Sequence, residues 1–258
     1  MSYELFVSLR HLKAKRTQRF ISLNTWISIG GVALGVMALI VVIAVMSGFG
    51  KDLRDKILGT NSHVVITNVT RSGMVDYEAV MEKVIKAEGV NAVAPFILNQ
   101  VMLAYGDNAI GVVVRGVDSD REAGVSDLEK NLVRGSLKML ERPAKSSGKP
   151  RRDGIILGKE LAHRLRGQNG DAVSMVAPAS RMTPMGLIPK IKLFKVVGLF
   201  ESGMFEYDSN LAFISIHSAQ KFFAMKGKVS GIEIRVEDIE KADQVAAGIQ
   251  ESLGFPYY

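Results

Sequence analysis

The sequence contains no cysteine, and this absence excludes several kinds of site. Disulfides, thiolate metal sites and a lipidated cysteine near the start are all ruled out. The redox compartment stays open, because a bacterial periplasmic protein need not carry disulfides. Histidine is scarce and lacks the paired spacing of metal ligands, so we expect no metal site. The four histidines are His11, His63, His163 and His217.

The motifs of nucleotide-binding and hydrolytic enzymes are also missing. The stretch nearest to a phosphate-binding loop, residues 147–150, lacks the first glycine and the final Ser or Thr. No G-x-S-x-G elbow occurs. We predict no carboxylate in the apolar setting of a catalytic acid, and we expect Glu206 and Asp208 to begin a strand. The sequence therefore predicts no catalytic residues, no cofactor and no enzyme.

Charge is absent from Phe20 to Gly50, whereas the rest of the chain is normally charged. Within this stretch, Ile27 to Met46 covers a hydrocarbon core of ~30 Å at about 1.5 Å per residue. We therefore predict a transmembrane helix at residues 20–50. A cleaved signal peptide is the competing interpretation, but its apolar core usually has only about 7–15 residues.

The positive charge of the chain is concentrated ahead of this helix. The formal net charge is +7, and five Lys or Arg residues lie between Arg10 and Arg19. The positive-inside rule places residues 1–19 in the cytoplasm and the chain after Met46 in the periplasm. Apolar residues at helical spacing from Tyr3 to Leu12 predict an amphipathic helix on the cytoplasmic leaflet, with a disordered basic tail as the alternative. The basic pI is thus weak evidence for nucleic acid, and we expect none.

Small residues form a stripe inside the apolar segment and predict helix packing on a partner or around a cavity. They are Ser28, Gly31, Gly35 and Ala38. The charged residues 51–60 are expected to continue the helix as a stalk, with Gly59 as its stop.

Beyond the stalk, the sequence predicts an α+β fold. A strand at 63–67, a helix at 76–87 capped by Asp76, strands at 92–104 and 110–117, a strand at 231–236 and a helix at 239–253 form the expected elements. Pro95 is expected to interrupt its strand. Residues 61–118 and 229–258 are therefore predicted to form an α/β-sandwich subdomain.

Residues 119–228 are predicted to be a mostly β subdomain inserted into the first. It is expected to open with a polar helical stretch at 126–140 and a loop at 142–152. A short helix at 159–165 and strands at 155–157, 172–177, 190–199 and 210–216 complete it.

One loop of the insertion, Pro178 to Pro189, has an unusual composition. Its three prolines predict that it does not form ordinary hairpin pairing. Its apolar side chains suggest an element that docks on a partner, with packing against its own domain as the alternative. The candidate binding residues are Pro178, Arg181, Met182, Thr183, Pro184, Met185, Gly186, Leu187, Ile188 and Pro189.

Several stretches, in order along nearly the whole chain, resemble permease subunits of lipoprotein-releasing ABC transporters, the Lol C/E family, which have a MacB-like periplasmic domain. The resemblance rests on residues 19–59, 115–118, 156–162, 192–198 and 205–208, and on Thr183 to Gly186 with Ile188 and Pro189. It implies that residues 178–189 are a C-type hook that captures a periplasmic carrier. Lys190 and Lys192, beside the hook, would supply basic contacts, and the Gly31/Gly35 helix would line or flank a cavity for acyl chains.

The resemblance also implies the partners. A separate cytoplasmic ATPase would drive a pair of permease subunits, which pass lipoproteins from the inner membrane to the carrier. Family members continue with three more membrane helices, so we expect this chain to be a fragment or a truncated reading frame. Two alternatives remain: a related mechanotransmitting ABC subunit for efflux or cell-wall control, and a signal-anchored periplasmic interaction module.

Overall fold

The computed structural model describes residues 3–13, 19–60, 62–69, 73–141, 152–183 and 186–258. The predicted loop at 142–152 lies outside the described residues, apart from Arg152. Two compact units make up the chain, Met1–Arg54 and Asp55–Tyr258.

The first unit is helical, as predicted. It contains α1 (Tyr3–Lys13) and most of α2 (Arg19–Thr60). Residues Leu23–Arg54 of α2 are long and apolar enough to cross a membrane, and none of their most apolar stretch is buried. Trp26 and Met46 are 70% and 69% exposed. Apolar side chains left uncovered on every face of a helix favour a lipid environment. The helix ends at Thr60, one residue beyond the predicted stop at Gly59.

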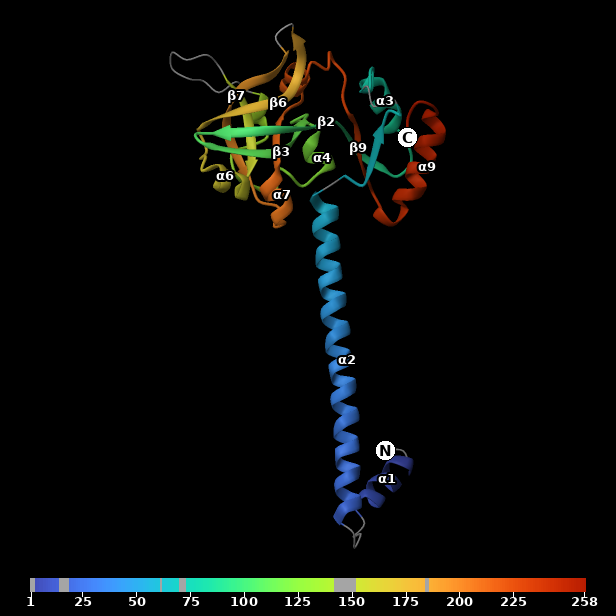
Figure 1. Cartoon of the computed structure of the whole chain (residues 1–258). Coiled ribbons are helices and arrows are strands. Elements are labelled where there is room, and N and C mark those ends of the chain that lie inside the picture. Colours follow the sequence, from blue (N-terminus) through green and yellow to red (C-terminus); the bar gives the residue numbers. More distant parts are fainter. Residues whose placement is uncertain (1–2, 14–18, 61, 70–72, 142–151, 184–185) are drawn as a thin grey trace. The chain divides into compact units, whose positions relative to one another are not determined.

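The second unit combines nine described strands with shorter helices (Figure 1). The strands are β1 (Val64–Thr67), β2 (Val90–Tyr105), β3 (Asn108–Val117), β4 (Leu132–Arg134), β5 (Asp153–Gly158), β6 (Ala172–Thr183), β7 (Gly186–Phe200), β8 (Leu211–Ser215) and β9 (Gly231–Val236). The helices are α3 (Tyr77–Val84), α4 (Glu122–Val125), α5 (Lys138–Glu141), α6 (Lys159–Leu165), α7 (Phe205–Asn210), α8 (Ile216–Phe223) and α9 (Ala242–Leu253), and α9 follows a 3-10 turn at Ile239–Lys241.

Six of the strands pair in a closed ring. Around it the order is β2-β3-β8-β5-β7-β6, and β6 returns to β2. The β3–β8 and β5–β7 pairs are parallel, and the others are antiparallel. Outside the ring, β9 and β1 extend the sheet from β2, and β4 pairs with β7. This mixed sheet with its covering helices confirms the predicted α+β class.

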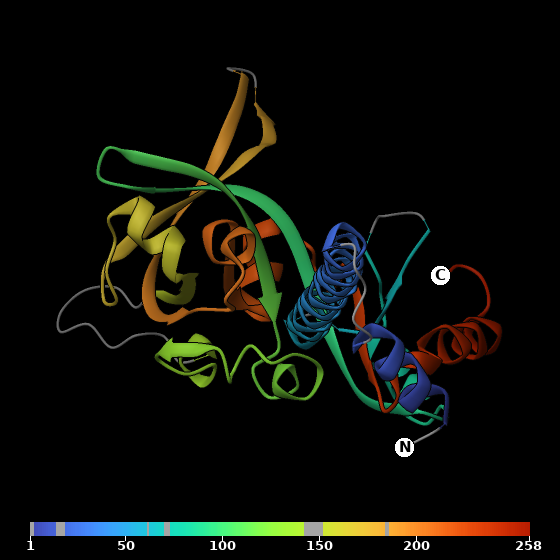
Figure 2. The ribbon, with the colours of Figure 1, turned by 90° about the horizontal axis from the view of Figure 1, so that it is seen from below.

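Strand β2 belongs to both parts of this sheet. Its first half, from Val90 to Phe96, pairs with β9, and its second half pairs with β3 and β6. Figure 2 shows the strand running from the side of α9 to its turn with β3. Strand β2 therefore connects the two predicted subdomains within one sheet, and the predicted boundary at residue 118 stays a prediction. Sequence periodicity reports which face of a strand is buried but not its partners, so it could not predict this double role of β2.

The alternation of buried and exposed side chains along the second half of β2 shows which face of the strand packs on the core. Ile97, Val101 and Leu103 are buried, whereas Leu98 and Met102 are 49% and 47% exposed. Because successive side chains of a strand point to opposite faces, one face of β2 packs on the core and the other is open.

Two glycines allow helices to pack closely on the ring. A Cβ at Gly116 in β3 would lie 2.5 Å from the Cβ of Ala219 in α8. At Gly158, where β5 meets α6, a Cβ would lie 2.1 Å from the carbonyl oxygen of Asp208 in α7. Both positions therefore require glycine for steric reasons.

Two predictions about secondary structure were wrong. Residues 126–140 are not a helical stretch but contain the short strand β4 and the start of α5. Gly135, with φ of +87°, separates these two elements, and such a backbone conformation does not occur within a helix. Pro95 does not interrupt β2. It pairs with Ile232 of β9 at a point where pairing with β3 has not yet begun, so its missing N–H affects at most one neighbour.

Two predictions about acidic residues were also wrong. Glu206 and Asp208 do not begin a strand but lie in α7, and β8 starts after them at Leu211. Asp208 is buried and accepts hydrogen bonds from the N–H and hydroxyl of Ser202, both at 2.8 Å. Asp76 precedes α3 as predicted, but its side chain makes no capping hydrogen bond, and its φ of 52° is left-handed.

Candidate functional site

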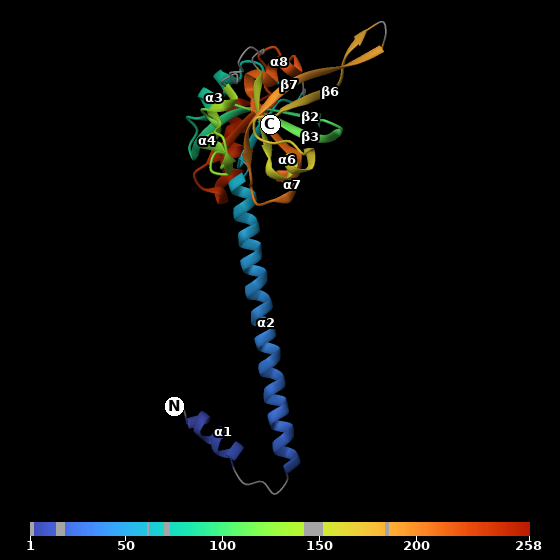
Figure 3. The ribbon, with the colours of Figure 1, turned by 90° about the vertical axis from the view of Figure 1, so that its left-hand side faces the viewer.

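The end of the β6–β7 hairpin, residues 178–189, is called the arm here. Pairing is regular from Ala172↔Lys195 to Ala177↔Lys190, breaks, and resumes between Arg181↔Ile188 and Thr183↔Gly186. Figure 3 shows the two strands extending away from the body of the second unit. The prediction that this segment lacks hairpin pairing was therefore wrong. Its prolines at 178 and 189 lie in the break, where no ladder hydrogen bond is required of them.

The predicted hook residues are distributed over both strands of the arm. Arg181, Met182 and Thr183 belong to β6, and Gly186, Leu187, Ile188 and Pro189 belong to β7. Pro184 and Met185 lie outside the described residues, as do the side chains of residues 178–188. The side chain of Pro189 is exposed at the base of the arm.

Lys190 and Lys192 follow the arm on β7, and both ammonium groups have partners within the unit. Lys190 donates hydrogen bonds to the carbonyl oxygens of Lys221 and Phe222, at 3.1 and 2.6 Å. Lys192 forms an ion pair with Asp153 at the start of β5. The predicted role of these lysines as basic contacts to a carrier must therefore compete with these internal contacts.

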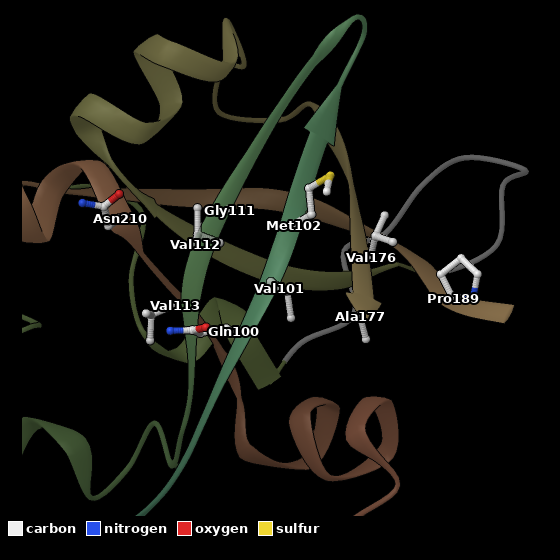
Figure 4. Close-up of a pocket in the computed structure, with 10 residues that line it drawn as sticks. All are labelled: Gln100, Val101, Met102, Gly111, Val112, Val113, Val176, Ala177, Pro189 and Asn210. Atoms are coloured by element: carbon white, nitrogen blue, oxygen red, sulfur yellow. The ribbon is translucent and has the colours of Figure 1, made fainter. Parts of the chain in front are cut away.

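A cavity of about 530 Å³ lies at the root of the arm. Figure 4 shows its lining residues, which come mainly from β2, β3 and β6. They are Gln100, Val101, Met102, Gly111, Val112, Val113, Val176, Ala177, Pro189 and Asn210. The lining is mostly apolar. It includes Ala177, the last residue of β6 that pairs regularly with β7 before the break, and Pro189, the last proline of the arm. The root of the arm is thus next to an open apolar surface.

The small residues predicted to pack on a partner all lie on α2 and are exposed. They are Ser28, Gly31, Gly35 and Ala38. A Cβ at either glycine would meet nothing within 4 Å in the described chain. Their part in helix packing or in a cavity stays a prediction.

Sequence reasoning missed a buried group of charges in the second unit. Arg115 on β3 donates to Glu233 on β9 and, at 3.2 Å, to Glu122 on α4. The hydroxyl of Ser126 donates to the same Glu122 oxygen at 2.7 Å. Arg115, Glu122 and Glu233 are 8%, 0% and 6% exposed. A possible signal was the single acidic residue inside the otherwise apolar first half of the 231–236 strand.

These charges are only partly compensated. Burial, with a smaller contribution from the nearby charge of Glu122, raises the pKa of Glu233 to about 7, although the charge and hydrogen bond of Arg115 act to lower it. Arg115 Nε and Glu122 Oε2 are buried and have no hydrogen-bond partner among the described residues. No group of three His, Asp or Glu side chains in the described ranges could hold a metal ion. The arrangement ties β3, β9 and α4 together, and it resembles a structural link more than a reactive centre.

The sequence profile of the family described as MacB-like periplasmic core domain matches residues 25–252, which is most of the chain. The chain belongs to this family. This MacB-like chain is 33% identical over 246 residues to the lipoprotein-releasing system transmembrane protein LolC of Neisseria meningitidis. It is 36% identical over 251 residues to the protein of the same name from Xylella fastidiosa.

These alignments cover 95% and 97% of the MacB-like chain but only 57% and 58% of the two relatives. The chain thus spans little more than half the length of the curated relatives it matches. Among solved structures, the periplasmic region of MacB from Actinobacillus actinomycetemcomitans superposes with a TM-score of 0.47 at 12% identity, over 78% of this chain and 88% of that one.

Proposed function

We propose that this chain belongs to the membrane permease subunit of an ABC transporter that extracts lipoproteins from the inner membrane and passes them to a periplasmic carrier. The proposal is supported by the names of the LolC relatives, by the apolar helix α2 and by the arm. ATP hydrolysis would be the task of a separate subunit, because the relatives are named as transmembrane proteins of a releasing system.

The proposed topology follows from charge. The basic cluster between Arg10 and Arg19 would stay in the cytoplasm, because Lys and Arg are retained there. Residues 23–54 would cross the membrane, and the second unit would lie in the periplasm. A cytoplasmic ATPase and a second permease subunit, identical or homologous, would complete the transporter.

The observation that carries the proposal is the arm. A two-stranded extension with a proline-bearing break at its base ends at the pair Thr183↔Gly186. Backbone pairing restrains the arm before it binds, so docking costs less conformational entropy than ordering a free loop. Methionine and leucine are apolar and adaptable, which suits them to insertion into the apolar cavity of a lipid carrier.

The proposal is tested by the capture of the purified periplasmic lipoprotein carrier by the full chain in detergent. Pro184→Ala and Met185→Asp are compared with Asp107→Ala, a change in the exposed β2–β3 turn. We expect Met185→Asp to abolish capture, Pro184→Ala to weaken it and Asp107→Ala to leave it intact. Capture that survives Met185→Asp, or no capture by the folded unsubstituted chain, would contradict docking by the arm.

A further inference from the structure

The arm begins at the break in β6–β7 pairing. Ala177↔Lys190 is the last regular pair before the break, and the next pair beyond it is Arg181↔Ile188. A break in the ladder removes the backbone hydrogen bonds that would otherwise stiffen the hairpin. Side-chain contacts at the last regular pair therefore have a large influence on how the arm is held.

Lys190 makes such a contact with α8. Its Nζ reaches the carbonyl oxygens of Lys221 and Phe222 in the last turn of that helix. The final carbonyls of a helix have no N–H donors within the helix, and they carry its negative partial charge. The lysine therefore supplies a donor that α8 lacks and connects the base of the arm to this helix.

Lys192 makes a second connection to the same helix through an aspartate. It forms an ion pair with Asp153, and the hydroxyl of Ser218 on α8 donates to the same Asp153 oxygen at 2.8 Å. Burial works to raise the pKa of Asp153. The hydrogen bonds from Lys192 and Ser218, together with the lysine charges, outweigh it and lower the pKa below its ordinary value.

Two buried rings complete the connection. Lys190 Nζ lies 5.4 Å from the ring centre of Phe222 on α8, and Lys192 Nζ lies 5.0 Å from that of Phe194 on β7. The two rings pack edge to face with centroids 6.2 Å apart. Both ammonium groups thus lie over aromatic faces that attract cations. Residues 190, 192 and 194 lie on one face of β7, because side chains alternate along a strand.

We propose that Lys190 and Lys192 are positioning residues that hold the base of the arm against α8. This inference depends on the proposed function only for the identity of the partner that docks on the arm. The bond from Lys192 to Asp153 orients the arm, and the bonds from Lys190 to α8 fix the residue next to the break.

Asp153 distinguishes positioning from direct contact. If Lys192 touched the carrier, Asp153→Asn would release its ammonium group, and capture would stay the same or become tighter. If Lys192 positions the arm, Asp153→Asn and Lys192→Met remove the same link. Each change is then expected to weaken the equilibrium affinity for the carrier about fivefold, and the double variant to be no weaker than either single one. Weaker capture by Lys192→Met with undiminished capture by Asp153→Asn would overturn the inference.

A second measurement needs no carrier. Because the chain has no cysteine, nitroxide labels can be placed at Leu187→Cys on the arm and His217→Cys on α8 without background labelling. Electron–electron double resonance on the full chain then reports the distribution of distances between them. We expect Lys192→Met, Lys190→Met and the milder Ser218→Ala to broaden or shift this distribution, while the unfolding temperature of the labelled chain stays close to that of the parent.

Lys195→Met is the matched control. It removes a lysine from the same strand but from the opposite face, and within the described ranges Lys195 makes no ion pair or side-chain hydrogen bond. Its distance distribution should equal that of the parent. Equal distributions for all variants would overturn the positioning role. If Met185→Asp leaves capture intact while the distributions broaden as expected, the proposed docking function fails and the positioning role stands.

Discussion

Asp127 donates its backbone N–H to the carbonyl oxygen of Gly59, 3.1 Å away, and so joins the last turn of α2 to the segment that follows α4. Its carboxylate also accepts hydrogen bonds from Lys130 at 2.8 Å and from Arg235 on β9 at 3.3 Å. A Cβ at Gly59 would lie 2.9 Å from the carboxylate of Asp127. Residues at the end of α2 that belong to the second unit are thus connected to β9 through one aspartate.

We expect Asp127→Ala to loosen this joint. Burial works to raise the pKa of Asp127, but hydrogen bonds and charge from Lys130 and Arg235 lower it overall. Loss of these contacts at a partly exposed site should reduce the free energy of unfolding by about 1 kcal/mol. Hydrogen exchange at the backbone amide of residue 127 should become faster in this variant. Asp120 is an exposed aspartate nearby, and Asp120→Ala should leave the exchange at residue 127 unchanged. Unaltered exchange in Asp127→Ala would show that the carboxylate does not secure the joint.

The lowered pKa of Asp127 also predicts how the stability of the fold changes with pH. A carboxylate whose pKa is lower in the folded chain stabilises the fold above its unfolded pKa, and this contribution is lost as pH falls through the folded value. The difference in stability between the parent and Asp127→Ala should therefore shrink in acid, below about pH 4.

Arg115→Met should destabilise the second unit strongly. The substitution leaves Glu122 and Glu233 buried without their cation, and breaking a buried ion pair in this way costs about 3–5 kcal/mol. Arg121→Met, which alters an exposed arginine near α4, is the matched control and should cost less than about 1 kcal/mol. Thermal unfolding followed by circular dichroism measures both. Similar losses for the two variants would contradict the importance of the buried group.

Glu233→Gln tests the pH dependence of this group. The pKa of Glu233 is raised to about 7 in the folded chain from an unfolded value of 4.5. A group with a raised folded pKa contributes stability below its unfolded pKa, and this stability is lost as pH rises through the folded value. The parent should therefore lose stability relative to Glu233→Gln between these two pH values. Parallel curves of unfolding temperature against pH for the two proteins would show that Glu233 titrates at its ordinary pKa.

Gly158→Ala should prevent the close approach of β5 to α7. The added Cβ would clash with a backbone carbonyl, which cannot rotate away as the end of a side chain can. We expect a loss of about 3 kcal/mol or failure to fold. Gly248→Ala on α9 is the control, because a Cβ there meets nothing within 4 Å and alanine favours a helix. Equal expression and unfolding temperature for the two variants would contradict the packing argument.

Local signals in the sequence predicted much of the fold. Helix α6 and strand β9 have the predicted bounds, 159–165 and 231–236, because apolar periodicity and flanking residues decide such short elements. The hairpin pairing of the arm was not predicted, because the effect of a proline depends on whether its position in the β6–β7 pairing requires a backbone N–H. The ring of six strands was missed because its pairings join distant parts of the chain.

The buried charges were missed for a related reason. Glu233 lies in a strand that is covered on both faces, and its partner Arg115 is more than a hundred residues away in the chain. Its apolar neighbours in the strand hint at burial, but nothing local identifies the distant arginine that pairs with it. The lysines beside the arm show the same limit, because their contacts with α8 and Asp153 become visible only in the folded chain. Their predicted contact with a carrier stays a prediction.

Photo-crosslinking from the arm tests the central claim most directly. A photoreactive amino acid at Met185 of the full chain, produced in bacterial cells together with the proposed ATPase and second permease subunit, is compared with the same group at Asp107. The account predicts a covalent product with the periplasmic lipoprotein carrier from position 185 and none from position 107. No carrier product from position 185, or equal products from both positions, would contradict docking by the arm.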